Sequence, residues 1–334
     1  MKDFKFYNYD TVKKFIAPRA GEMKFGEQIQ FVENFEFLKH HSARYVLFGI
    51  PEDIGVRANL GKAGARNAWK SCLKALLNIQ SNHYVNPKNL VLLGEVRCEE
   101  LLEKASNIDE KDLNYQAKLG DLVTSLDLVV SHLVQKIVQL GKIPIIIGGG
   151  HNNAYGNIRG TSIALKKTIN VLNIDAHTDL RTPDVRHSGN GFSFASRENF
   201  LGDYRVFGLH KNYTPEYIFE AISHSKKDHF YLFEDLLPLS SEEVLQVFQE
   251  QLQLVAESDF GLELDCDSIA DFPSSAISPS GFSIAAIRNF LHLAGKEKNI
   301  KYLHICEAAP DESSERATGK ALSYFITDFI QHEI

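Results

Sequence analysis

The sequence predicts a single-domain α/β fold of three layers, in which helices cover both faces of a doubly wound, mostly parallel sheet of eight strands. Eight short apolar runs alternate along the chain with segments of helical periodicity, a pattern typical of parallel α/β sheets. The chain has 334 residues, of which 44% are hydrophobic, so it can bury one large core. No internal repeat, low-complexity tract or composition break marks a second domain.

Each expected strand is one of these short apolar runs. They are residues 45–49, 90–94, 142–147, 169–174, 204–208, 228–233, 260–264 and 302–306. Helices are expected between the strands, at residues 61–77, 119–140, from 152, from 215, 240–255, up to 293 and 318–330. Residues 119–140 carry apolar side chains at helical spacing, so we expect them to pack on the core. Residues 1–40 contain no clear strand, and we expect a helical extension there, packed on a domain of residues 41–334.

Charge and composition exclude several classes of protein. The formal net charge is −7 and there is no long basic run, which argues against nucleic acid as a partner. The chain opens without the apolar core of a signal peptide, and no apolar run approaches membrane-spanning length. The cysteines lack metal-binding or redox spacing, which fits a reducing compartment. We therefore expect a cytoplasmic protein that does not interact with membranes.

Three groups of polar side chains directly follow expected strands. In the first group every second residue is a candidate metal ligand, so the side chains project to one side of an extended backbone. The second group repeats this spacing with two aspartates, and the third is a histidine after three glycines. Ligands bind in the crevice beyond the strand carboxyl ends of open parallel sheets, so we expect the groups to meet there. The six residues are His151, Asp175, His177, Asp179, Asp265 and Asp267.

The chemistry of this set points to a pair of metal ions. Two imidazoles and four carboxylates without a thiolate suit Mn²⁺ and tolerate Zn²⁺, Fe²⁺ or Ni²⁺. Four buried aspartates repel one another and shift toward protonation, whereas two divalent cations cancel their charge. A paired site can bridge one water, lower its pKa and supply hydroxide at neutral pH. A single Asp-x-Asp is more often a turn or a helix cap, so the prediction depends on the conjunction of all three groups.

Three motifs resemble the signatures of the ureohydrolase superfamily, which includes arginase, agmatinase and formimidoylglutamase. They are Gly148-Gly149-Gly150-His151, Asp175-Ala176-His177-Thr178-Asp179 and Asp265-Cys266-Asp267. The resemblance covers residues 45–330 and implies an arginase-like fold, two Mn²⁺ per chain, hydrolysis at a guanidine or amidine carbon, and a trimer or hexamer. By this match both ions share Asp175 and Asp265, and each is completed by one further pair: His151 with Asp179, and His177 with Asp267.

Two acids are candidate catalytic residues. Glu307 follows the expected strand at 302–306 and resembles the substrate-facing glutamate of the family's Glu-x-x-Pro element. An acid there would orient the nitrogen-bearing carbon and stabilise positive charge in the tetrahedral intermediate. The alternative is a structural carboxylate tied to backbone donors. Asp179 is the expected partner that orients the attacking hydroxide by a hydrogen bond.

The loops beyond the strands indicate the substrate. Cations are expected around a mouth otherwise lined by acids, where they would bind carboxylates: Arg181, Arg186 and Lys211. Agmatine has no carboxylate and arginine has one, whereas N-formimidoyl-glutamate has two. Residues 187–193 resemble the corresponding segment of formimidoylglutamases, which makes Ser188 and Asn190 further substrate-binding candidates.

Phe192 stands where arginases and agmatinases carry a histidine that is usually assigned a proton-relay role. The phenylalanine at this position weakens the arginase interpretation. It also means that the residue that protonates the leaving group is not identified by the resemblance. His187 and His210 are the candidates, and the alternative for each is a loop histidine without proton transfer.

The expected reaction is hydrolysis of N-formimidoyl-L-glutamate to L-glutamate and formamide by a metal-bridging hydroxide. Three alternatives remain from the sequence. They are a ureohydrolase that releases urea from arginine, agmatine or another guanidino acid, a non-catalytic member that keeps the fold, and an amide deacetylase that uses one zinc.

Overall fold

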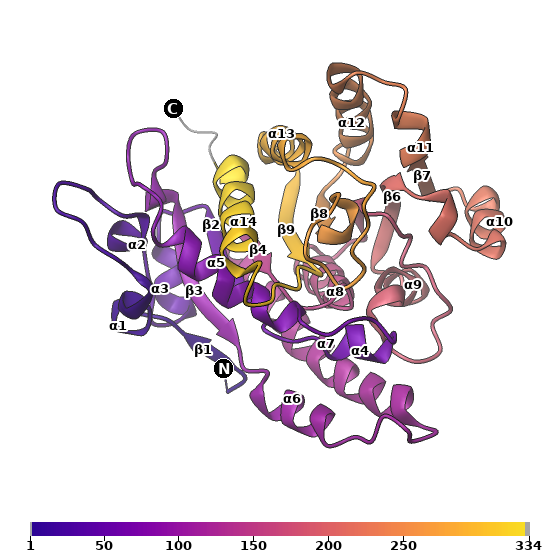
Figure 1. Ribbon diagram of the computed structural model, residues 1–334, viewed down its shortest axis with the longest axis horizontal. Helices are drawn as coiled ribbons and strands as arrows, with labels where there is room; N and C mark the ends of the chain where they lie inside the picture. The colour runs from indigo at the N-terminus through magenta and orange to yellow at the C-terminus, as the bar shows by residue number, and fades with distance from the viewer. Residues whose placement is uncertain (1, 331–334) are drawn as a thin grey trace.

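The computed structural model describes residues 2–330, and its centre is one nine-stranded sheet (Figure 1). The strand order is β1-β3-β2-β4-β9-β8-β5-β6-β7. The strands are β1 (Phe4–Phe6), β2 (Tyr45–Gly49), β3 (Leu90–Val96), β4 (Ile143–Ile147), β5 (Ile169–Ile174), β6 (Leu201–Leu209), β7 (Asp228–Leu232), β8 (Phe260–Asp265) and β9 (Ile300–Cys306). Strands β2 to β9 pair in parallel, which confirms the doubly wound, mostly parallel sheet.

The ninth strand, β1, lies in the N-terminal segment where no strand was expected, and that expectation was wrong. It pairs antiparallel with β3, with Phe4 opposite Val96. Three residues are too few to show periodicity in the sequence, and the strand forms because Phe4 is buried against Phe6 and Phe48. The short helices α1 (Tyr9–Val12), α2 (Phe25–Gln28) and α3 (Phe35–His40) follow. The division into residues 1–40 and 41–334 stays a prediction.

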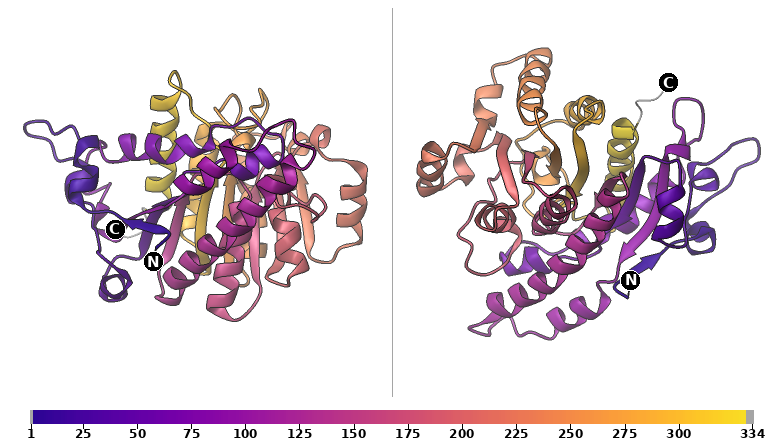
Figure 2. Two further views of the ribbon diagram at one scale, coloured as in Figure 1. Left: turned by 90° about the horizontal axis from the view of Figure 1, so that it is seen from below. Right: turned by 180° about the vertical axis from the view of Figure 1, so that it is seen from behind.

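Two layers of helices cover the sheet (Figures 1 and 2). One layer contains α5 (Ala68–Leu76), α12 (Ser241–Val255), α13 (Ile284–Gly295) and α14 (Glu315–Ile330). The other contains α7 (Tyr115–Gln139), α8 (Asn153–Leu165) and α9 (Gly191–Arg197). The remaining α-helices are α4 (Ile54–Ala58), α6 (Glu99–Ser106), α10 (Glu216–His224) and α11 (Phe233–Leu236). In α7, Leu126, Val130 and Leu133 are fully buried, which confirms that the predicted apolar face packs on the core.

The expected helix at residues 61–77 begins only at Ala68. Before it, α4 ends and a turn follows in which Leu60 has φ 61° and Gly64 has φ 137°. Because positive φ is incompatible with a right-handed helix, the helix cannot extend through this turn. The turn places Asn59 beside the site described below.

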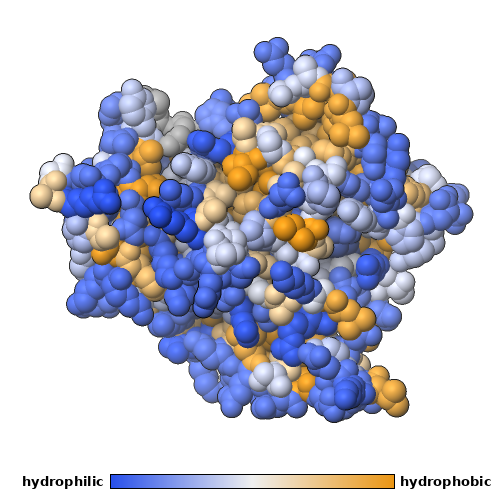
Figure 3. All heavy atoms as spheres, viewed as in Figure 1, coloured by the Kyte–Doolittle hydropathy of each residue, from blue (hydrophilic) through white to orange (hydrophobic). Residues whose placement is uncertain are grey.

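The surface adds two observations. On the face in Figure 3, apolar side chains gather near α12 and α13, where a hollow of about 300 Å³ is lined by Phe233, Leu236, Val244 and Phe290 among others. Within residues 2–330, none of the helices combines the length and apolar character that crossing a membrane requires.

The expected homo-oligomer stays a prediction.

Strands β4, β9, β8 and β5 lie next to one another, so their carboxyl ends meet at one edge of the sheet. Ile147 is in register with Ile305, and Leu264 is in register with both Ile305 and Ile174. All the predicted metal ligands and Glu307 follow these four strands. The parallel topology therefore brings together residues that are up to 156 positions apart in the chain.

Candidate metal centre and active site

The structure brings the six predicted ligands together in two groups. In the first, Nδ1 of His151 lies 2.8 Å from Asp179 Oδ2, 3.1 Å from Asp265 Oδ2 and 3.3 Å from Asp175 Oδ2. In the second group, Nδ1 of His177 lies 2.9 Å from Asp267 Oδ2 and 3.6 Å from Asp175 Oδ1. Within each group one ligand atom per residue lies within 4.8 Å of the others. Asp175 belongs to both groups, one oxygen in each.

Local turns aim the carboxylates. Asp175 Oδ1 accepts a hydrogen bond from the backbone N–H of His177 at 2.7 Å, and Asp265 Oδ1 accepts one from Asp267 at 2.8 Å. Both are Asx-type turns at the end of a strand. Each turn leaves the second carboxylate oxygen directed at a histidine of the cluster. The turn-forming role and the ligand role of Asp-x-Asp are thus combined in the same side chains.

Buried acids hold the glycine loop that carries His151. Glu52 accepts hydrogen bonds from the backbone N–H of Gly150 and from the side-chain amides of Asn152 and Asn153. A Cβ on Gly149, which has φ 76°, would lie 2.7 Å from Glu52 Oε1, so only glycine fits there. Glu307 accepts from the backbone N–H of His151 at 2.6 Å. The loop is therefore fixed from both sides.

The buried charges fit a site for cations. Burial, followed by the charges of Asp267 and Asp175, raises the pKa of Asp265 well above its usual range. Burial likewise raises the pKa of Asp179 and of Asp267. Neither ring nitrogen of His151 has a hydrogen bond of good geometry in the described structure, and Asp267 Oδ1 also has none. Buried polar atoms without partners are rare in native proteins, and nitrogen and oxygen donors so arranged suit divalent first-row metals.

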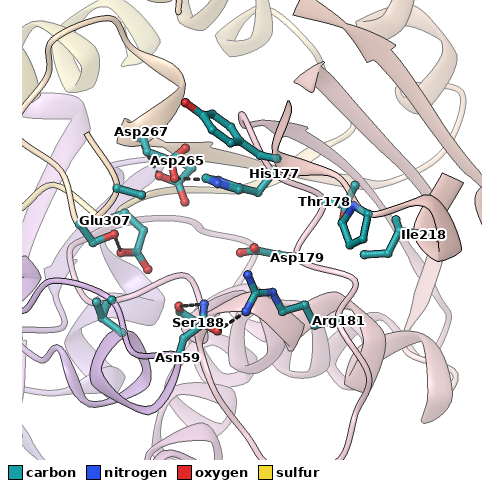
Figure 4. A pocket seen from close by; sticks show the side chains of 16 residues that line it. Asn59, His177, Thr178, Asp179, Arg181, Ser188, Ile218, Asp265, Asp267 and Glu307 are labelled. Carbon is teal, nitrogen blue, oxygen red and sulfur yellow. Dashed lines mark hydrogen bonds and ion pairs between the residues drawn. The ribbon is translucent and has the colours of Figure 1, made fainter. Parts of the chain in front are cut away.

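Four residues of the cluster line a cavity of about 150 Å³ (Figure 4). Its wall includes His177, Asp179, Asp265, Asp267 and Glu307 together with Asn59, Arg181, Ser188, Tyr213 and Ser275. Glu307 accepts a hydrogen bond from Ser275 Oγ across this wall. Burial, with the nearby charge of Asp179, raises the pKa of Glu307 to about 8. Asp179 and Glu307 both have left-handed backbones, with φ 48° and 60°, a strain typical of functional residues.

Of the predicted carboxylate-binding residues, the structure brings Arg181 and Ser188 to the cavity. Arg181 is the one Lys or Arg that lines it within residues 2–330. Its Nη1 donates to Asn59 Oδ1 at 3.0 Å, and Asn59 Nδ2 donates to Ser188 Oγ at 3.2 Å. The three side chains form a polar strip across the cavity from Asp265 and Asp267 (Figure 4).

The structure does not bring Arg186, Asn190 or Lys211 to the cavity. Arg186 is buried and forms a bidentate ion pair with Asp127 in α7, at 2.8 and 3.0 Å. Asn190 is fully buried and bonded to Arg186 and to loop backbone. The backbone N–H of Lys211 donates to a carboxylate of α11, and its Nζ lies 3.7 Å from a second one. Arg186 and Asn190 are thus bonded within the protein, and Lys211 lies on the surface beside α11.

The two candidate proton donors also lie outside the cavity wall. His187 is buried, its Nδ1 accepts from the backbone N–H of Gly189, and burial with the charge of Arg181 lowers its pKa to about 4. His210 is buried and stacks on Phe233 with ring centroids 4.7 Å apart, and burial lowers its pKa. Phe192 packs edge-on against His151 at 5.1 Å and therefore supports the ligand from behind.

Sequence reasoning missed three features of the site. Asn59 lies on a turn whose position depends on the backbone of Leu60 and Gly64. Tyr213 lines the cavity and stacks on His177, with centroids 5.2 Å apart. Glu263 and His304 form a buried pair beside His151. Glu263, Asp265 and Asp267 stand at every second position, so their side chains point to the same face of the strand. This spacing could have indicated from the sequence that Glu263 lies near the cluster.

Comparisons with known proteins agree with this geometry. A family model described as the arginase family matches residues 43–331. A formimidoylglutamase of Lysinibacillus sphaericus (strain C3-41) is 28% identical over 296 residues, covering 86% of this chain and 84% of the relative. A formimidoylglutamase of Streptococcus gordonii is 26% identical over 317 residues, covering 91% of this chain and 89% of the relative.

Solved structures share the fold. A crystal structure of Trypanosoma cruzi formiminoglutamase with Mn²⁺ superposes with a TM-score of 0.73 at 20% identity, covering 92% of this chain and 97% of that one. The formimidoylglutamase of Bacillus subtilis gives a TM-score of 0.71 at 16% identity, with 93% of each chain covered. These likenesses confirm the arginase-like fold expected from the motifs. Since the family model spans most of the sequence, the chain belongs to the arginase family.

Proposed function

We propose that this protein is a manganese-dependent hydrolase that converts N-formimidoyl-L-glutamate and water to L-glutamate and formamide. The observation that carries the proposal is the position of Arg181 and Ser188 on the wall of the cavity that four residues of the carboxylate and histidine cluster also line. A substrate with an amidine at one end and carboxylates at the other matches both parts. The formimidoylglutamase relatives support the same substrate.

The proposed cofactor is two Mn²⁺ per chain. One ion would be held by His151, Asp175, Asp179 and Asp265, and the other by Asp175, His177 and Asp267, with Asp265 shared as the family match implies. When bound, such a pair supplies a water whose pKa is lowered toward neutrality and a positive field at the reacting carbon. The aspartates would then be ionised, because the cations offset the burial and mutual repulsion that otherwise raise the pKa of three of them.

The protein side chains orient the reactants. Asp179 projects into the cavity and holds the attacking water by a hydrogen bond. Glu307 faces the amidine, and a cationic amidine nitrogen at this carboxylate favours its ionised form. Water adds to the formimidoyl carbon and gives a tetrahedral intermediate. The bond from this carbon to the glutamate nitrogen then breaks, and the nitrogen leaves as the amine with a proton that the water gave up. Positive charge develops on the substrate during this step. The carboxylates of Glu307 and Asp179 face this charge and stabilise it.

The carboxylate end of the substrate is assigned to Arg181 and Ser188. A guanidinium recognises a carboxylate through two parallel N–H donors, which an ammonium cannot reproduce. The other charged groups of the wall are acids or histidines, so Arg181 is the group that can bind a carboxylate there. A substrate without a carboxylate would leave Arg181 without an ionic partner.

The test is a substrate panel with Mn²⁺-loaded protein, scored by product. N-formimidoyl-L-glutamate should yield formamide and L-glutamate, while arginine and agmatine should yield no urea. Urea release from either guanidino compound at a higher kcat/KM would establish a ureohydrolase of another specificity. Absence of turnover on all three compounds, with metal bound, would support a non-catalytic family member.

A further inference from the structure

Asn59 connects the one cation of the cavity wall to a hydroxyl of the same wall. It is the C-terminal cap of α4, and its backbone N–H is bonded to the carbonyls of Gly55 and Val56. From this fixed position the side chain forms hydrogen bonds to Arg181, 122 residues later in the chain, and to Ser188, 129 residues later. Figure 4 shows the three side chains in one row along the cavity.

The hydrogen-bonding chemistry fixes the direction of every bond in this row. A guanidinium has only donors, so the group of Asn59 that faces Arg181 must be the carbonyl oxygen. The amide NH₂ of Asn59 therefore faces Ser188 and donates to its hydroxyl oxygen. Because Ser188 Oγ accepts this bond, its own O–H hydrogen is directed elsewhere. Both neighbours of Asn59 thus present donors.

The donors of Arg181 are otherwise uncommitted. Within residues 2–330, the one hydrogen bond of the Arg181 side chain goes to Asn59, and no carboxylate lies at ion-pair distance from its guanidinium. Its N–H groups beyond Nη1 are therefore available to an anion. A guanidinium held at one nitrogen and free at the others is suited to bind a carboxylate in the bidentate geometry.

We propose that Asn59 is a positioning residue for substrate specificity, which anchors the Arg181 guanidinium and turns the Ser188 hydroxyl outward so that both donate to one substrate carboxylate. This inference rests on the proposed function, because it requires a substrate with a carboxylate. It adds a residue that contacts neither the metal ligands nor the reacting carbon.

The sharpest test is Asn59→Asp, which keeps the shape of the side chain and reverses the hydrogen bonding. The new carboxylate offsets the charge of Arg181 and accepts the Ser188 O–H hydrogen. The substrate carboxylate therefore loses the Ser188 donor and much of its attraction to Arg181. We expect the KM for N-formimidoyl-L-glutamate to rise roughly tenfold or more, as for loss of charge-assisted hydrogen bonds, with kcat changed by less than about twofold. Bound Mn²⁺ and the Tm should match those of the unmodified protein.

Two controls separate positioning from general effects. Asn212→Asp adds the same charge to the exposed loop that carries Tyr213, and its KM should not change. In an Arg181→Ala background, Asn59→Asp should raise KM by a much smaller factor, because the two residues act as one unit. Asn59→Ala, which adds no charge, should raise KM less than Asn59→Asp does.

Binding of L-glutamate to the Mn²⁺-loaded protein, measured by calorimetry, gives a readout independent of turnover. Its Kd should rise in Asn59→Asp by a factor similar to that in KM. The inference is overturned if Asn59→Asp leaves KM and the glutamate Kd unchanged, or if its effect is equally large in the Arg181→Ala background. Turnover of the unmodified protein in the same assay tests the proposed function separately.

Discussion

Glu263 Oε2 lies 2.5 Å from Nδ1 of His304, and both side chains are completely buried beside the cluster of histidines and aspartates. Nε2 of His304 lies 3.3 Å from the carbonyl oxygen of Gly148, and Nε2 of His151 lies 3.6 Å from Glu263 Oε2. The pair therefore joins β8 and β9 to the loop that carries His151. Burial alone would raise the pKa of Glu263, but the charge of His304 and the hydrogen bond of His151 outweigh it and lower the pKa to about 2.

Removing one member of this pair should be more harmful than removing both. His304→Leu leaves the Glu263 carboxylate buried without its partner and should lower the free energy of unfolding by about 3–5 kcal/mol. The double change Glu263→Met with His304→Leu removes both members of the pair and should cost clearly less. Urea unfolding of the metal-free proteins measures both values. A single variant as stable as the double variant would show that the pair carries no buried charge.

Replacing Glu307 tests its role opposite the amidine. Glu307→Gln keeps the hydrogen bond from the backbone N–H of His151 but removes the negative charge that faces the substrate. Bound Mn²⁺ should stay the same, and kcat should fall by roughly 10²-fold or more, as for loss of a group that stabilises developing charge. Glu312→Gln, on an exposed loop, is the matched control. Normal kinetics in Glu307→Gln would remove this residue from the mechanism.

Arg186 should act on stability and not on substrate binding. Its ion pair with Asp127 is buried, and Arg186→Ala would leave that carboxylate without its cation. We expect the free energy of unfolding to fall by about 3–5 kcal/mol. Arg316→Ala, at an exposed position of α14, is the control and should change it by less than about 0.5 kcal/mol. A rise in KM for Arg186→Ala without loss of stability would show that Arg186 binds the substrate after all.

The pH dependence of stability should show the burial of His187. Its pKa is about 4 in the folded protein and near 6.5 in the unfolded chain, so folding favours the neutral imidazole. Its contribution is complete above pH 6.5 and is lost progressively as the pH falls toward 4. His187→Asn keeps an acceptor for the Gly189 N–H but does not titrate. Its unfolding free energy, measured by urea at each pH, should depend less on pH than that of the unmodified protein across this window.

The sequence allowed the convergence of the six candidate ligands to be predicted because each of them directly follows a strand. Asp175, His177 and Asp179 alternate along one strand end, and parallel topology alone brings them to the same edge as His151 and Asp265. The register of β8 against β9, in contrast, decides that Glu263 lies opposite His304. Register depends on the packing of the whole sheet and cannot be inferred from either strand separately.

For a similar reason, the sequence did not show which of the predicted substrate-binding residues reach the cavity. Arg181 and Arg186 are both arginines of one polar loop, and their sequence context does not distinguish them. Arg186 turns inward because α7 offers a buried carboxylate at Asp127, within a helix whose periodicity predicts core positions. Asn59 reaches Arg181 only through a turn made by Leu60 in a left-handed conformation. Both contacts join segments more than 50 residues apart.

The central claim is that six side chains from three strand ends hold a pair of cations that hydrolysis requires. Measuring bound manganese and formamide production in the unmodified protein and in Asp265→Ala tests this most directly. We predict about two Mn²⁺ per chain with turnover of N-formimidoyl-L-glutamate, and loss of both in Asp265→Ala while the fold remains. Formamide production by metal-free Asp265→Ala would contradict the account.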